Sequence, residues 1–149
     1  MSKKTVYNFL ELEFKKLYDD MKIFVENKEL RNIFNNHKKL LKDIVYYIYF
    51  NNEIYYEKGL SIYDNIKLLR EARLVDEYVE EMLLKALKNA ELYEERIDAK
   101  EDCFYDDIEV ERLADENFEK IYELIIWLVL TYGQENYQFL KENLSDEYK

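Results

Sequence analysis

Side chains that could perform chemistry are scarce in this chain. It contains one histidine, His37, and one cysteine, Cys103, with no proline and two glycines in 149 residues. General acid–base catalysis near neutral pH uses His most often, nucleophilic catalysis uses an activated thiol or hydroxyl, and phosphate-binding loops use several glycines. One imidazole and one thiol, far apart in the sequence, indicate a binding or scaffold protein more than an enzyme.

Arg31 and His37 form a pair with a catalytic interpretation. The string RNIFNNH resembles the Arg-x4–6-His motif of the HEPN helical ribonucleases, in which the imidazole moves a proton and the guanidinium holds a phosphate, usually across a dimer interface. We favour a structural histidine instead, because His37 lies between Phe34 and Leu41 on the apolar face of a predicted helix. Six residues also place Arg31 and His37 roughly 120° apart around that helix.

Acidic residues between 101 and 111 could bind a metal ion if their oxygens converged on one point. An EF-hand loop needs alternating acids, a central glycine and a terminal glutamate, and this pattern is absent. The acids around Cys103 also disfavour its reactive thiolate form. We therefore expect no metal and no other cofactor. The alternative is an exposed interaction surface made of Glu101, Asp102, Asp106, Asp107, Glu109 and Glu111.

The net charge of −11 is concentrated in the second half of the chain. Residues 1–75 carry 14 Lys and Arg against 11 Asp and Glu, whereas residues 76–149 carry 8 against 22. Within Glu91–Glu119 there are 13 acids and 3 bases. This charge repels phosphates, so we expect no direct nucleic-acid binding. Such binding would need a local basic face on the first half, and the acidic half could instead mimic DNA.

Aromatic residues gather in YYIYFNNEIYY, residues 46–56. Exposed aromatic rings can stack on nucleic-acid bases. No basic residue lies between Asp43 and Lys58 to attract the phosphates. We therefore expect this segment to be partly core and partly hinge.

Helical periodicity predicts an all-α fold, a single bundle of about five helices. Apolar residues recur at steps of three and four over about residues 5–26 and 29–50. A break containing Gly59 follows. Next, Ser61 has capping-box spacing with Asp64 at the start of a helix that runs to about residue 72.

The second half of the chain is predicted to hold two more long helices. Asp76 is the expected cap of the first of them, and a long acidic loop is expected over about residues 93–113. Asp115 would then cap the last long helix, which Gly133 ends. Its buried stripe is predicted to be Ile121, Ile125, Trp127, Leu128 and Val129. A short helix over about 135–144 would follow.

Length and composition favour one domain, residues 1–149, with 48% hydrophobic residues. The longest apolar run, Ile121–Tyr132, is shorter than the roughly 20 residues that span a bilayer. No signal peptide is visible at the start, and a single cysteine fits a reducing compartment. We expect a cytoplasmic protein that does not contact a membrane.

Three segments resemble one family when they are taken in order: IVYYIYF (44–50), SIYDNIKLLREARLV (61–75) and IYELIIWLVLTYG (121–133). They are similar to the HEPN-like helical domain of unknown function at the N-terminus of the restriction subunits of type I restriction–modification enzymes. The resemblance covers roughly residues 6–135, which leaves a short C-terminal helical tail. It implies a HEPN-like bundle and a setting in defence against foreign DNA.

The resemblance also bears on activity. Where the family has Gly-Asn-x-x-x-His, this chain has Lys88, Asn89 and Tyr93, so the histidine of that signature is missing. Our leading hypothesis is a non-enzymatic helical module that binds a protein partner in restriction or phage defence, with a homodimer left open. The alternatives are a HEPN-type ribonuclease that uses Arg31 and His37, and an acidic phage-encoded antagonist that mimics DNA.

Overall fold

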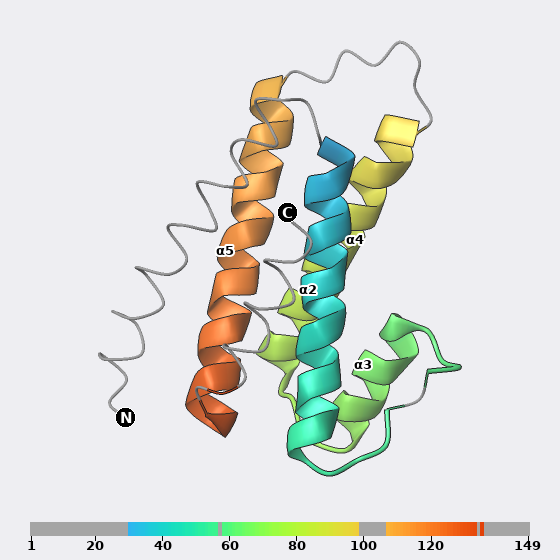
Figure 1. Ribbon diagram of the computed structural model, residues 1–149, viewed down its shortest axis with the longest axis vertical. Coiled ribbons are helices and arrows are strands. Elements are labelled where there is room, and N and C mark those ends of the chain that lie inside the picture. The colour runs from blue at the N-terminus through green and yellow to red at the C-terminus, as the bar shows by residue number, and fades with distance from the viewer. Residues whose placement is uncertain (1–29, 57, 99–106, 134, 136–149) are drawn as a thin grey trace.

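Four α-helices make up the part of the chain that the structure describes, and that part contains no β-strand (Figure 1). The computed structural model describes residues 30–56, 58–98, 107–133 and 135. With the labels of Figure 1, the helices are α2 (Leu30–Asn51), α3 (Ile62–Glu71), α4 (Glu77–Asp98) and α5 (Asp107–Tyr132). The all-α prediction is confirmed there. The helices predicted over about 5–26 and 135–144 lie outside the described residues.

The three long helices α2, α4 and α5 pack against one another, and the short α3 packs against α2 and α4 near one end (Figure 1). Each long helix contributes buried apolar residues three or four positions apart, which places them on one face. The central ones are Leu41, Ile44 and Ile48 of α2, Val79, Leu83 and Leu87 of α4, and Ile121, Leu124, Ile125 and Leu128 of α5. Among the described helices, none combines the length and the apolar content required to cross a lipid bilayer.

Two helix starts follow the capping signals in the sequence. The Ser61 hydroxyl accepts a hydrogen bond of 3.1 Å from the backbone N–H of Asp64, and Asp76 Oδ1 accepts one of 2.9 Å from the N–H of Val79. These bonds satisfy N–H groups that have no partner within the first turn of a helix. The predicted starts of α3 and α4 are therefore confirmed.

Replacing Asp76 by Ala is expected to lower the free energy of unfolding by about 1 kcal/mol, because the N–H of Val79 then loses its acceptor. Glu81→Ala is the matched control, since Glu81 is an exposed acid on the same helix. Its effect should stay within about 0.5 kcal/mol. Urea denaturation measures both. Equal losses in the two variants would show that the cap does not stabilise α4.

The long acidic loop predicted before the last helix is largely wrong. α4 continues to Asp98 and α5 begins at Asp107, so Asp115 lies inside α5 and does not cap it. Residues 99–106 are outside the described part. Glu forms helices well, and acids near a helix N-terminus interact favourably with its dipole. Repulsion between acids on one helix face costs only about 0.2–0.5 kcal/mol per pair, so it did not break these helices.

The C-terminal end of α5 follows the prediction more closely. Gly133 has a φ of 120°, which favours glycine, and its N–H donates a 2.9 Å hydrogen bond to the carbonyl of Val129. The stripe that includes Leu128 and Val129 is buried, as predicted. Trp127 is only half-buried, however, because a step of 100° turns it away from Leu128. Its ring meets the ring of Tyr132 edge-on, with centroids 5.9 Å apart.

Two hydrogen bonds made by side chains fix one end of the bundle, where α2 and α5 end. The Tyr49 hydroxyl donates to the carbonyl of Asn65, 3.0 Å away, which joins α2 to α3 in the core. Asn52 Nδ2 donates to the Tyr132 hydroxyl at 2.9 Å, which joins the end of α2 to the end of α5. These bonds hold the connection between α2 and α3 against the bundle.

α4 and α5 are joined by a buried amide. Asn117 Nδ2 donates to the carbonyl of Ala86 at 3.1 Å, and Asn117 Oδ1 accepts from Asn89 Nδ2 at 3.3 Å. Asn117 is fully buried, so its bond to Ala86 is shielded from water, while the bond from Asn89 is partly buried. Asn89 therefore has a structural role, since it links α4 to α5.

Candidate functional site

The single histidine lies in the interior. His37 has an exposed fraction of 0%, and its two ring nitrogens have no hydrogen-bond partner in the described part of the structure. Its ring packs edge-on against Phe34, with centroids 5.9 Å apart. Burial lowers the pKa of His37 to about 3, so the imidazole is neutral at physiological pH. The predicted burial is confirmed. Arg31 lies on the same helix, and its side chain is outside the described residues.

The acidic residues singled out by the sequence are divided between two regions. Asp107, Glu109 and Glu111 lie in the first turns of α5 and not in a loop. Glu101, Asp102 and Asp106 are outside the described residues, as is Cys103. Within the residues that the structure describes, no group of three or more His, Cys, Asp or Glu side chains is arranged to hold a metal ion.

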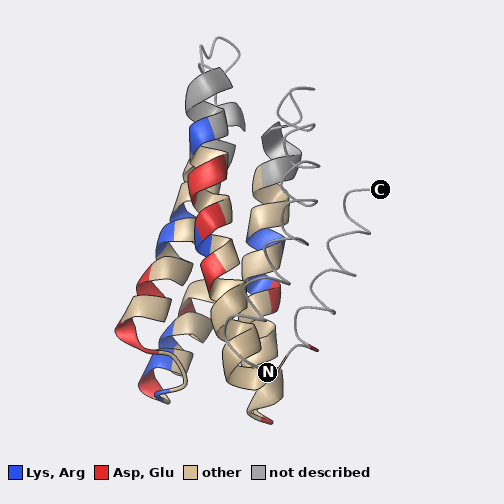
Figure 2. Cartoon of the chain, turned by 90° about the vertical axis from the view of Figure 1, so that its left-hand side faces the viewer, with Lys and Arg blue, Asp and Glu red and all other residues tan. Residues whose placement is uncertain are grey.

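An acidic groove runs between α4 and α5. Figure 2, which faces α5, shows its acidic residues in bands above an uncharged lower part. The groove has a volume of about 350 Å³. Its charged lining residues are Glu81, Lys85, Glu116, Glu119, Lys120 and Glu123. The Tyr78 hydroxyl donates a 2.9 Å hydrogen bond to Glu123 across it. We call this the glutamate groove.

A second groove, with the opposite charge, lies between α2, α3 and α4. It has a volume of about 660 Å³. We call it the lysine groove, and its lining residues are Lys38, Lys39, Lys42, Tyr56, Lys58, Leu60, Ser61, Ile62, Leu87 and Glu91. Sequence reasoning missed it because the lysines lie on either side of the aromatic segment. The sequence did contain one indication of this groove: Lys38 and Lys42 are four residues apart, so they lie on the same face of a helix.

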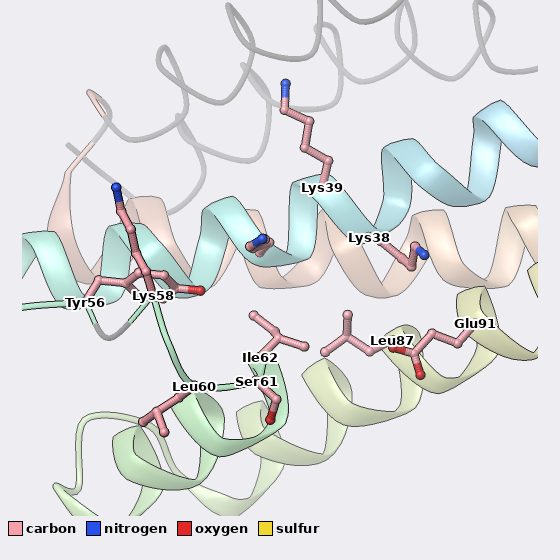
Figure 3. A pocket seen from close by; sticks show the side chains of 10 residues that line it. Lys38, Lys39, Tyr56, Lys58, Leu60, Ser61, Ile62, Leu87 and Glu91 are labelled. Carbon is pink, nitrogen blue, oxygen red and sulfur yellow. The ribbon is translucent and has the colours of Figure 1, made fainter.

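The connection after α2 brings the last lysine into this groove. The chain turns at Glu53, whose φ is 56°, and the N–H of Ile54 donates to the carbonyl of Tyr49 at 3.1 Å. The connection then leads to Lys58 beside α2 and to the cap of α3 (Figure 3). Lys58 thereby lines the same groove as Lys38 and Lys42, although it is sixteen or more positions away from them in the sequence.

One carboxylate also lines the lysine groove. Glu91 Oε2 accepts a hydrogen bond of 2.6 Å from the Tyr63 hydroxyl, which ties α4 to α3. Burial, and then the hydrogen bond and the charge of Glu91, raise the pKa of Tyr63, so this tyrosine stays protonated as the donor. Glu91 is thus held by the protein at one side of the groove.

Aromatic residues at the end of α2 form a cluster beside the lysine groove. The rings of Tyr46 and Phe50 stack with centroids 6.3 Å apart, and Tyr46 meets the edge of Tyr56 at 5.7 Å. Tyr56 also lines the lysine groove, and its pKa is raised by burial and by the nearby charge of Asp43. The segment is partly core, since Tyr49 is buried, and its outer side chains are exposed.

We use the name aromatic patch for four exposed residues of this segment: Tyr46, Phe50, Ile54 and Tyr55. Their exposure is large for apolar side chains, reaching 60% for Phe50 and 76% for Tyr55. The sequence grouped these residues correctly but could not show which of them face solvent.

No known protein-family model, curated protein or solved structure matches this chain. The HEPN-like relationship therefore remains a prediction from the three sequence segments.

Proposed function

We propose that this protein is a non-enzymatic helical module that binds a protein partner through the aromatic patch. The observation that supports it is the exposure of Tyr46, Phe50, Ile54 and Tyr55 within one short segment. Scattered exposed apolar residues are ordinary on a protein surface, whereas a gathered set marks an interaction site. Aromatic side chains are also enriched where protein interfaces are most tightly packed.

The chemistry of the interior supports binding over catalysis. A buried, neutral His37 whose nitrogens have no partner in the described residues is poorly placed to exchange a proton with a substrate. The proposed setting, restriction or phage defence, rests on the resemblance of the three sequence segments. A homodimer would be one form of such a protein contact.

Replacing Phe50 and Tyr55 together by Ser is expected to reduce recovery of the partner about tenfold when the tagged full-length chain is purified from its native cells. Both side chains are largely exposed, so the fold should be preserved, and circular dichroism checks this. Leu130→Ser is the matched control, because Leu130 is an exposed apolar residue elsewhere, on α5. Its partner recovery should equal that of the unchanged protein.

Two results would replace this proposal with one of the alternatives. RNA cleavage by the purified protein that disappears in a folded His37→Leu variant would establish the ribonuclease. Recovery of a DNA-binding protein that depends on Glu119 and Glu123, and not on the aromatic patch, would establish the acidic antagonist. The glutamate groove is the observation that favours this second candidate.

A further inference from the structure

The lysine groove concentrates positive charge on a chain whose net charge is −11. A cleft whose charged lining is mostly of one sign, here four lysines against Glu91, focuses the electric field and raises the local concentration of ions of the opposite sign. Each lysine ammonium also offers three hydrogen-bond donors to an oxyanion. The groove is therefore suited to an anionic ligand.

Three of the lysines that line the groove come from two segments of the chain. Lys38 and Lys42 are four residues apart on α2, and Lys58 comes from the connection that leads to α3. In Figure 3 the labelled Lys38 and Lys58 stand on either side of the apolar centre of the groove. The side chains of Lys39 and Lys58 both extend away from that centre in this view. We leave Lys39 out of the site because it lies about 100° around α2 from Lys38, whereas the flexible four-carbon stem of Lys58 can turn inward from the connection.

The centre of the groove is apolar. Ile62 and Leu87 point toward each other between α3 and α4, with Leu60 to one side (Figure 3). Tyr56 adds an aromatic ring to the lining. Ligand sites commonly combine such an apolar lining with a few charged groups that fix the orientation of the ligand. An inorganic anion alone would leave this surface uncovered.

The size of the groove and the charge of the chain limit the ligand. A volume of about 660 Å³ lies within the range of small-molecule sites. A long polyanion would extend beyond the lysines into the field of an acidic protein. We propose that the lysine groove binds a small organic diphosphate, with its phosphates on Lys38, Lys42 and Lys58 and its apolar body against Ile62, Leu87 and Tyr56. This ligand site is separate from the protein-binding function proposed above.

Isothermal titration calorimetry on the full chain in metal-free buffer tests the proposal, because only the lysines can then neutralise the phosphates. Adenosine diphosphate probes a flat ring, geranyl diphosphate probes an aliphatic body, and inorganic pyrophosphate probes the charge alone. At least one organic diphosphate should bind about tenfold more tightly than pyrophosphate, a difference of ~1.4 kcal/mol. The better of the two organic ligands identifies the kind of body that the groove accepts.

The variant Lys42→Gln/Lys58→Gln should weaken binding of that ligand about tenfold or more. The matched control is Lys67→Gln, since Lys67 is an exposed lysine of α3 that does not line the groove. Its dissociation constant should not change. The proposal is overturned if no organic diphosphate binds at millimolar concentration, if pyrophosphate binds as tightly as both, or if the two variants behave alike. Binding of a single-stranded oligonucleotide in preference to all three probes would also overturn it.

Discussion

Replacing Leu128 by Ala is expected to lower the free energy of unfolding by about 2–5 kcal/mol, a large part of the stability of a domain of this size. Leu128 is fully buried on α5, where it belongs to the cluster shared by α2, α4 and α5. The substitution removes apolar contacts and leaves a cavity that the surrounding helices fill only in part. Chemical denaturation, with circular dichroism as the signal, measures the loss.

Leu130→Ala is the matched control for this prediction. Leu130 lies two residues further along α5, has an exposed fraction of 41%, and loses the same atoms on substitution. Its effect should remain within about 0.5 kcal/mol. Similar losses at positions 128 and 130 would contradict the orientation of α5 in the bundle.

Acidification from pH 6.5 to pH 5 is expected to destabilise the protein by about 2 kcal/mol through His37 alone. Burial lowers the pKa of His37 to about 3 in the folded state, from 6.5 in the unfolded chain. Below pH 6.5 the unfolded state therefore binds a proton that the folded state does not, and stability falls as the pH falls. The slope approaches about 1.4 kcal/mol per pH unit until the folded pKa is reached.

His37→Leu tests this cause directly, because His37 is the only histidine in the chain. The variant should lose the His37 contribution to the pH dependence between pH 6.5 and 5. It should also be more stable than the unchanged protein near pH 8, by about 1–3 kcal/mol, since it removes two buried nitrogens that have no partner in the described residues. Denaturation curves at a series of pH values measure both effects. A variant that retains the slope would show that His37 is hydrated or paired.

The sequence predicted those parts of the fold that depend on residues close to one another in the chain, such as helix ranges and helix caps. The predicted range of 29–50 agrees with α2 (Leu30–Asn51), because apolar spacing alone marks this helix. Asp76 marks the start of α4 by a hydrogen bond within three residues. The prediction that Asp115 caps a helix was wrong, because the backbone before Asp115 is already helical. A capping residue begins a helix only where the preceding backbone is not already helical, and here α5 was already formed from Asp107.

The proposed binding surfaces depend on contacts that the sequence does not encode locally. The absence of a basic residue between Asp43 and Lys58 argued against nucleic-acid binding by the aromatic segment and gave no sign of an anion site, yet the fold places Lys42 and Lys58 around one groove. That juxtaposition requires the turn at Glu53 and the packing of α3 between α2 and α4. The same limit applies to Phe50 and Tyr55, since an aromatic residue at a helix end can be buried or exposed according to which helices cover it.

The buried amide of Asn117 determines how α4 and α5 can align along their length. Leucine and isoleucine contacts change little if one helix slides by a turn, a shift of about 5.4 Å. Such a slide would separate Asn117 from both the carbonyl of Ala86 and the amide of Asn89. Each polar group stranded in the core would cost about 1–3 kcal/mol. The two hydrogen bonds of Asn117 therefore select one alignment of α4 and α5, which apolar contacts alone would not. The shape of the glutamate groove between these helices depends on that alignment.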